Sequence, residues 1–223
     1  MVSNKDFNPS YVGQRPDIER LVPPGVKYVL DVGCSNGVVG EAIKAKTGAQ
    51  VIGIELSPEM ASEAAGRLDK VFAGDAGEVI QRGELDDYRF DAIIFADLLE
   101  HLIDPWAVLR AAAARLQPDG VVIASIPNVR HIDTLCNLIV KGYWPYRERG
   151  IHDRTHLRFF TRKNIMALFQ SAGLSIETMK ANYRILEKPY RFNRYARLLA
   201  LPGLKGFFAF QYVVRARLAK HPA

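Results

Sequence analysis

The chain has 223 residues, of which 48% are hydrophobic and 24% are charged, and these proportions suit one folded domain and exclude extensive disorder. Two cysteines exclude a disulfide framework and a multi-cysteine metal site, and favour a reduced, cytoplasmic setting. We expect neither a signal peptide nor a transmembrane span, because no apolar run reaches about eighteen residues. A single domain over residues 1–223 is therefore predicted.

The net charge of +6 is unevenly distributed along the chain. Residues 1–128 hold 12 basic and 19 acidic side chains, whereas residues 129–223 hold 18 basic and 5 acidic ones. The basic second part predicts either an anionic partner or a solvated basic face. Such a partner could be a phosphorylated substrate, a membrane surface or a nucleic acid.

The first part of the chain alternates short apolar, β-branched runs with helical patterns. The predicted strands are 26–32, 50–54, 68–72, 90–95 and 121–125, the last one after the turn Pro118-Asp119-Gly120. The predicted helices are 38–46, a segment opened by Ser57-Pro58-Glu59, and 106–116. Parallel strands need crossover connections that cover the sheet, so this order predicts an α/β fold with helices on both faces.

The second part of the chain begins with a long segment, residues 127–160, that is rich in aromatic and charged residues and has no clear periodicity. Long loops inside compact domains are usually functional, and we predict a substrate-facing insertion here. A capped helix at 161–171 and two further strands at 174–181 and 207–217 follow.

Residues 190–201 predict a basic amphipathic helix inserted between the last two strands. Phe192, Tyr195, Ala196 and Leu199 recur at helical spacing, with Arg191, Arg194 and Arg197 around the remaining circumference. Three roles stay open for this helix: contact with an anionic membrane, a lid over the active site, or an ordinary surface helix.

A glycine-rich turn follows the first predicted strand, where residues 31–37 read Asp-Val-Gly-Cys-Ser-Asn-Gly. Such a turn lets a nucleotide-like ligand approach the backbone at a helix N-terminus. The nicotinamide fingerprint G-x-G-x-x-G would place glycine at positions 33, 35 and 38, but the chain has Ser35 and Val38. A nicotinamide-dependent oxidoreductase is therefore the weaker alternative.

The same turn resembles the first motif of class I S-adenosylmethionine-dependent methyltransferases, D-x-G-C-G-x-G, with Ser35 in place of the middle glycine. Three further segments resemble this family in register: Glu55 after the second strand, Gly74-Asp75-Ala76 after the third, and residues 90–102, which end in Leu-Glu-His-Leu. The resemblance implies a Rossmann-like seven-stranded sheet in the order 3-2-1-4-5-7-6 with strand seven antiparallel.

The resemblance also implies which residues bind S-adenosylmethionine. Glu55 would accept hydrogen bonds from the ribose hydroxyls, because a carboxylate can accept two donors, and Asp75 would accept one from the adenine amine. In related enzymes an N-terminal segment folds over the cofactor, here with Tyr11 and Arg15. The full cofactor-binding prediction comprises Tyr11, Arg15, Asp31, Gly33, Cys34, Ser35, Asn36, Gly37, Glu55, Leu56, Gly74, Asp75, Ala76, Asp97 and Leu98.

Methyl transfer to a hydroxyl oxygen uses a general base, and His101 suits this role by its residue type and position. His152 and His156 are further catalytic candidates, with Asp97 and Asp153 in reserve. The spacing of His152 and His156 could serve a metal, but the segment lacks a carboxylate-rich context and no metal is predicted.

Residues 151–161 are similar to a segment of bacterial methyltransferases associated with cell-surface polysaccharide assembly. Together with the cofactor motif and the histidines, this predicts O-methylation of a sugar or another small hydroxylated acceptor, either anionic or lipid-linked. The enzyme is expected in the cytoplasm, with the basic C-terminal part as a candidate contact to the inner membrane face. Arg154 and Arg158 could clamp an acidic group of the acceptor.

Two alternatives use the same cofactor turn differently. The basic C-terminal part prompts an RNA methyltransferase. However, residues 96–99 read Ala-Asp-Leu-Leu and do not match the motif of enzymes that methylate base amines, so a nucleic-acid partner is not expected. The other alternative is a cofactor-binding module without catalysis.

Overall fold

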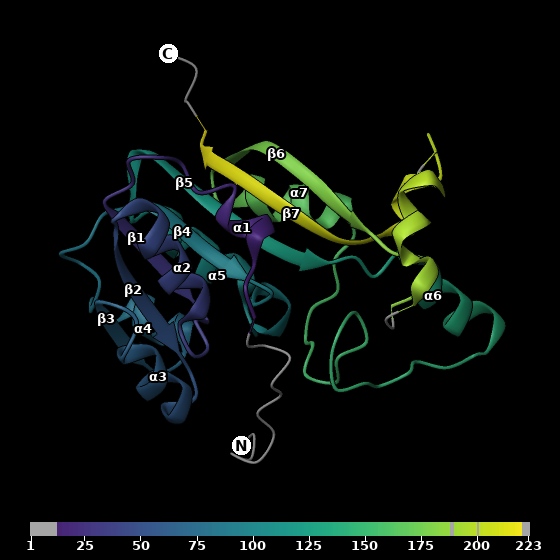
Figure 1. Ribbon diagram of the computed structural model, residues 1–223, viewed down its shortest axis with the longest axis horizontal. Helices are drawn as coiled ribbons and strands as arrows, with labels where there is room; N and C mark the ends of the chain where they lie inside the picture. The colour runs from purple at the N-terminus through teal and green to yellow at the C-terminus, as the bar shows by residue number, and fades with distance from the viewer. Residues whose placement is uncertain (1–12, 188–189, 200, 220–223) are drawn as a thin grey trace.

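A seven-stranded sheet forms the centre of the molecule in this computed structural model, which describes residues 13–187, 190–199 and 201–219 (Figure 1). The strand order is β3-β2-β1-β4-β5-β7-β6, and β7 runs antiparallel to both of its neighbours. The predicted sheet is thereby confirmed. The strands are β1 (Tyr28–Val32), β2 (Gln50–Glu55), β3 (Lys70–Ala73), β4 (Phe90–Ala96), β5 (Leu116–Pro127), β6 (Leu174–Tyr183) and β7 (Ala209–Leu218).

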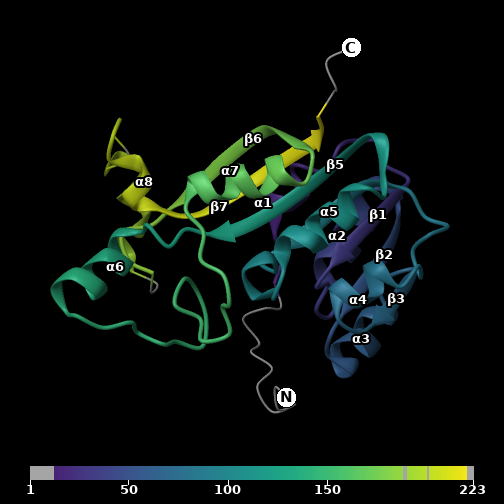
Figure 2. The same cartoon turned by 180° about the vertical axis from the view of Figure 1, so that it is seen from behind.

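Helices cover both faces of this sheet, as predicted. One face carries α1 (Pro16–Glu19), α2 (Val38–Thr47) and α3 (Pro58–Ala65). The other face carries α4 (Ala76–Gln81), α5 (Pro105–Ala113) and α7 (Arg162–Ser171). Figure 1 shows α1 and α2 in front of the sheet, and the reverse view in Figure 2 shows α5 and α7 in front.

Successive side chains of the central strands point to opposite faces of the sheet, so the hydrophobic core is divided into two clusters, one on each face. Val29 packs into the cluster under α1 and α2, whereas its neighbour Leu30 packs into the cluster under α4, α5 and α7. Both side chains are fully buried. Each such burial contributes about 1.5–3 kcal/mol to stability, and the two-sided core holds the carboxyl ends of β1 to β4 at one edge.

Two predicted boundaries were wrong because a local turn signal lies inside a strand. The predicted helix 106–116 ends at Ala113, and β5 already begins at Leu116, where it pairs with Phe90. The next pair is Val121 with Ala92, so residues 117–120, including the predicted turn, bulge out within the strand. The start of β7 also differs, for another reason: the predicted strand began at residue 207, but residues 205–208 form the short helix α8 (Lys205–Phe208), so β7 begins at Ala209.

The predicted insertion 127–160 is not wholly irregular. It contains α6 (Ile132–Leu135), which continues as the π-helix η3 (Cys136–Val140). The sequence pattern also missed α4, which begins at Ala76 directly after its cap residue Asp75. In the described part of the chain, no helix combines the length and the apolar character that crossing a bilayer requires.

Residues 191–199 form a 3-10 helix, η4 (Arg191–Leu199), instead of the predicted α-helix. With about three residues per turn, positions 192, 195 and 198 share one side, so the predicted apolar face was wrong. Phe192 is 37% exposed and Tyr195 is 41% exposed, whereas Ala196 is buried. This segment, α8 and α6 lie together at the end of the molecule opposite β3 (Figures 1 and 2).

Candidate active site

The loop after β1 has the backbone shape that close approach of a ligand requires. Gly33 has φ +74° and Gly37 has φ +83°, and both lie in the left-handed region that favours glycine. A Cβ on Gly33 would lie 2.9 Å from the Leu98 side chain, so the loop packs directly against the end of β4. Ser35 also has a positive φ, +50°, although it is not glycine. The turn therefore keeps a glycine-like shape at Ser35 at some cost in strain.

Glu55, at the end of β2, is bonded to the loops after both β1 and β2. Its Oε2 accepts the backbone N–H of Ser35 at 2.8 Å, and its Oε1 accepts that of Ser57 at 2.9 Å. Each carboxylate oxygen has two acceptor positions, so two remain for hydroxyl donors. Leu56 follows with its side chain 65% exposed, which places an apolar surface beside this carboxylate.

Three residues of the predicted cofactor turn are buried in the fold. Asp31 is only 1% exposed, and its Oδ2 is buried without a hydrogen-bond partner among the described residues. Burial, reinforced by the negative charge of Glu55, raises the pKa of Asp31 to about 7. The Cys34 side chain packs against Gly53, and the Asn36 carbonyl accepts a hydrogen bond from Arg67 at 2.7 Å. These residues shape the turn, and direct contact with a cofactor stays a prediction for them.

The loop after β3 lies at the same edge of the sheet. Gly74 has φ +154° and donates its N–H to the Glu55 carbonyl at 2.8 Å. Asp75 caps α4, and its Oδ1 accepts the Glu78 N–H at 3.1 Å, which leaves further acceptor positions on the carboxylate. Ala76 is buried in the first turn of α4. Parallel strands thus bring Gly74 and Asp75 beside Glu55, as the family resemblance implies.

Asp97, at the end of β4, is held by several side chains in an uncommon conformation, with φ +55°. Its carboxylate accepts the Ser125 hydroxyl at 3.0 Å and also accepts hydrogen bonds from Arg15 and Gln211. Arg15 is thus brought to the cofactor edge, where it pairs with Asp97. The prediction for Tyr11 lies outside the described residues.

His101 ends the short 3-10 helix η2 (Leu99–His101), one turn after Leu98. The Thr155 hydroxyl donates to Asp153 Oδ1 at 2.6 Å, and the same oxygen lies 3.0 Å from His101 Nδ1. Because that hydroxyl proton goes to Asp153, Thr155 accepts from His101 Nδ1–H, and Nε2 keeps the lone pair. Burial lowers the pKa of His101, although the charge of Asp153 and a hydrogen bond to the Thr155 backbone oppose this.

Glu100 and His156 lie beside His101. The ring centroids of His101 and His156 are 4.6 Å apart, and His156 Nε2 lies 4.0 Å from Glu100 Oε1. Burial raises the pKa of Glu100 well above its ordinary value, and burial lowers that of His156 to about 4. A cavity of about 10 Å³, close to the size of one water, borders both Glu100 and His156.

His152, the third catalytic candidate, points into a separate buried cluster. Its Nδ1 contacts the carboxylate of Glu187 at 2.5 Å, and Arg147 forms ion pairs with both Glu187 and Asp133. Burial, followed by the charge of Arg147, lowers the pKa of His152 to about 4. Within the described residues, these contacts tie the insertion to the chain after β6.

The two predicted clamp arginines both bond within the protein. Arg154 pairs with Glu148 on the surface, and Arg158 Nε donates to the Ile103 carbonyl at 3.1 Å. Their role toward an acceptor stays a prediction. The structure brings together His101, His156 and Asp153 from the predicted set, and it adds Glu100, Thr155, Ser125 and Gln211, which sequence reasoning missed.

A family model described as a methyltransferase domain matches residues 14–179, which is well over half of the chain. The chain belongs to this methyltransferase domain family. The match begins beside Arg15 and includes the ends of β1 to β4, which carry the cofactor loops. Family membership sets aside the oxidoreductase alternative.

Curated relatives of this methyltransferase carry the name ubiquinone biosynthesis O-methyltransferase. One, from Xanthomonas axonopodis pv. citri, is 30% identical over 195 residues, which is 77% of this chain and 71% of the relative. Another, from Neisseria meningitidis serogroup A, is 30% identical over 173 residues, which is 74% of this chain and 71% of the relative. Neither is named for polysaccharide assembly, so that expectation has no support here.

Solved structures of methyltransferases share the fold at low sequence identity. An S-adenosylmethionine-dependent methyltransferase from Archaeoglobus fulgidus aligns with a TM-score of 0.63, 18% identity and 90% coverage of each chain. The CcbJ methyltransferase from Streptomyces caelestis aligns with a TM-score of 0.62, 17% identity, and coverage of 93% of this chain and 92% of that one. These likenesses confirm the Rossmann-like methyltransferase fold.

The methyl donor of this methyltransferase is S-adenosylmethionine, which is left as S-adenosylhomocysteine after transfer. The residues of the site fit this cofactor. Glu55 offers acceptor positions for ribose hydroxyls, and Leu56 an exposed apolar surface. The Ser35 hydroxyl has no hydrogen-bond partner among the described residues. A polar group is therefore available to a ligand where the cofactor turn meets Glu55.

Proposed function

We propose that this methyltransferase transfers a methyl group to a hydroxyl oxygen of a small acceptor with an apolar or lipid-linked body. The relatives named as ubiquinone biosynthesis O-methyltransferases support the oxygen acceptor. The sugar acceptor predicted from the sequence finds no support among them. The observation that carries the proposal is the hydrogen-bond chain from Asp153 through Thr155 to His101, beside the cofactor loop.

His101 is the proposed general base. Thr155 fixes its tautomer, so Nε2 holds a lone pair, and Leu98 connects the helical turn of His101 to Gly33 of the cofactor loop. S-adenosylmethionine supplies an electrophilic methyl group. The acceptor oxygen forms the new bond to this methyl carbon while the carbon–sulfur bond breaks and its electron pair stays on sulfur. The hydroxyl proton passes to His101 Nε2.

The test of this function compares His101→Gln with the wild-type enzyme. Gln keeps a polar side chain of similar reach but supplies no imidazole base. We expect calorimetric binding of S-adenosylmethionine to be unchanged and methyl transfer to fall by about 100-fold or more, the usual contribution of a general base. Normal turnover by the variant contradicts the assignment of His101, and absence of cofactor binding by the wild-type enzyme contradicts the function itself.

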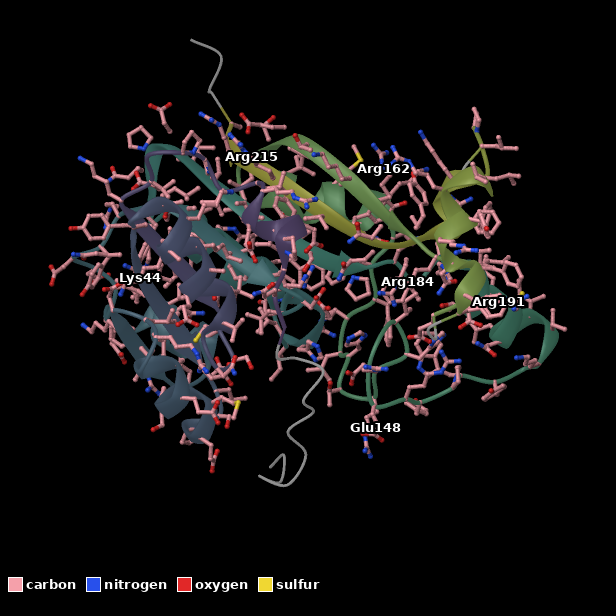
Figure 3. The ribbon with its side chains drawn as sticks, viewed as in Figure 1. Lys44, Glu148, Arg162, Arg184, Arg191 and Arg215 are labelled. Carbon is pink, nitrogen blue, oxygen red and sulfur yellow. The ribbon has the colours of Figure 1, made fainter. Side chains whose placement is uncertain are left out.

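We also propose that the end formed by α6, η3 and η4 contacts an anionic membrane surface. Ile139 and Val140 are each 78% exposed and Leu198 is 73% exposed. Arg191, Arg194 and Arg197 of η4 are exposed at the same end, and Figure 3 shows Arg191 there. Apolar side chains beside several arginines suit an interfacial site, where each basic residue contributes about 1 kcal/mol.

Vesicle sedimentation tests the membrane proposal. We expect the enzyme to pellet with vesicles that contain phosphatidylglycerol and to stay in the supernatant with vesicles of phosphatidylcholine alone. A variant with Ile139→Ser and Val140→Ser should lose most of the binding, whereas Met166→Ser, another exposed apolar residue on α7, should not. Equal binding of the two variants contradicts the proposed surface.

A further inference from the structure

We propose that Glu100, His101 and His156 form a binding site for one divalent transition-metal ion. A carboxylate oxygen of Glu100 and one ring nitrogen of each histidine all lie within 4.8 Å of one another. Ligand atoms at about 2.1 Å from one ion lie at most about 4.2 Å apart, so a side-chain shift of a few tenths of an ångström brings all three within reach of one ion. The residues come from two distant segments, η2 after β4 and the insertion, which the fold brings together.

The hydrogen bonds of both histidines prepare them for coordination. His156 Nδ1 donates to the Ile151 carbonyl at 3.2 Å, so its Nε2, the nitrogen that faces Glu100, carries the lone pair. His101 Nδ1 is fixed in the same way by Thr155. Histidines that bind metals in proteins typically donate their other ring N–H to a carbonyl, carboxylate or water. Both histidines here have this arrangement.

Glu100 provides the second, independent observation. Its side chain is only 1% exposed, and neither carboxylate oxygen has a hydrogen-bond partner among the described residues. A buried carboxylate without partners is costly, because its desolvation is not offset. The Nε2 lone pair of His156 faces this side chain at 4.0 Å, and a cation bound between these two acceptors would offset the cost.

The cluster of Asp133, His152 and Glu187 shows the contrasting arrangement. Its three side chains have similar spacing, but Arg147 forms ion pairs with both carboxylates and supplies the positive charge from within the protein. At Glu100 the structure describes no such arginine or lysine bond. The difference singles out the Glu100 cluster as the one that takes an external ion.

Two imidazoles and one carboxylate suit Zn²⁺, Co²⁺, Fe²⁺ or Mn²⁺ better than Mg²⁺ or Ca²⁺, which prefer oxygen ligands. The functional consequence rests on the proposed role of His101. In the proposed reaction, a lone pair of the His101 ring takes the proton of the substrate hydroxyl. A metal ion bound to His101 would occupy this lone pair. We therefore expect occupancy of the site to inhibit methyl transfer.

Cobalt binding tests the site directly, without any acceptor. We expect the chelator-treated enzyme to bind one Co²⁺ with visible d–d absorption, and X-ray absorption of the wild-type complex to report two imidazole ligands. Glu100→Gln and His156→Gln should each weaken binding by about tenfold or more, whereas the control Asp133→Asn, in the Arg147 cluster, should bind as the wild type does. As a control for folding, the binding of S-adenosylmethionine to each variant is measured by calorimetry.

The activity measurement separates this inference from the proposed function. Added Zn²⁺ should inhibit the wild-type enzyme, and Glu100→Gln should be about tenfold less sensitive, with inhibition of each protein expressed relative to its own metal-free rate. Lack of cobalt binding, binding without imidazole ligands, or loss of binding in Asp133→Asn overturns the site. If cobalt binds as expected but His101→Gln is fully active without metal, the metal site stands and the general-base proposal fails.

Discussion

The carboxylate of Glu55 accepts the backbone N–H of Ser35 at 2.8 Å and that of Ser57 at 2.9 Å, so one side chain joins the loops that follow β1 and β2. Two roles meet in this residue. It fixes the shape of the cofactor turn, and its remaining acceptor positions are available to ribose hydroxyls. Loss of its charge should therefore affect cofactor binding more than folding.

Glu55→Gln should raise the dissociation constant of S-adenosylmethionine by about tenfold or more. The amide of Gln offers one acceptor oxygen instead of two, so a charge-assisted bond to one backbone N–H is lost together with an acceptor for the ribose. Isothermal titration measures the change. Glu84→Gln, an exposed carboxylate on the loop before β4, is the matched control and should bind normally. Equal affinities of the two variants contradict the prediction.

Ser35→Gly should stabilise the enzyme by about 1 kcal/mol. Glycine relieves the cost of a positive φ in a residue with a Cβ and removes a buried hydroxyl that lacks a partner, although it adds entropy to the unfolded chain. Urea unfolding measures the free energy. In contrast, Gly37→Ala should destabilise, because its Cβ would lie 3.1 Å from the Ala64 Cα. A loss of stability in Ser35→Gly would show that the strain at this position is absent.

Thr155→Val should lower kcat by about tenfold while leaving S-adenosylmethionine binding unchanged. The substitution removes the hydroxyl that links Asp153 to His101 and fixes the His101 tautomer. Thr155→Ser keeps the hydroxyl and should restore most of the activity. A merely structural role of Thr155 predicts instead that Val and Ser behave alike, and steady-state kinetics of the two variants decides between these outcomes.

Asp31→Asn should become progressively more stable than the wild-type enzyme as pH rises from about 4 to about 7. The folded-state pKa of Asp31 is raised from 3.8 to about 7. Its contribution to stability is therefore fully present below the unfolded-state pKa and is lost as pH rises through the folded-state value. The difference amounts to a few kcal/mol at most. Urea unfolding of both proteins at pH 4, 5.5 and 7.5 tests this, and a constant difference contradicts it.

The sheet and the cofactor turn were predictable because their signals are local. Each strand is a short apolar run of residues, and Asp31, Glu55 and Asp75 follow or end strands at the spacing that the family resemblance requires. Strand ends were harder to place where Pro118-Asp119-Gly120 suggested a turn, since pairing with β4 tolerates a bulge there. The 3-10 geometry of η4, in which Ala196 is buried, had no local signal in the sequence that separated it from an α-helix.

The acceptor side of the site was only partly predictable. His101 and His156 stand out by residue type, but their contact joins segments more than fifty residues apart in the sequence. Thr155 has no chemical signature by itself, and Glu100 reads as an ordinary polar residue until its burial is known. Contacts between the residues after β4 and the insertion depend on the path of the insertion through space. The sequence of the insertion shows no helical or strand periodicity from which this path could be predicted.

Transfer of a labelled methyl group tests the central claim most directly. The enzyme is incubated with S-adenosylmethionine that carries a carbon-13 methyl and with a lipid extract that contains hydroxylated acceptors, and the product is examined by nuclear magnetic resonance. We predict a new signal of a methyl group on oxygen, strongly reduced in His101→Gln. A labelled methyl on nitrogen or carbon, or no labelled product beside confirmed cofactor binding, would contradict the account.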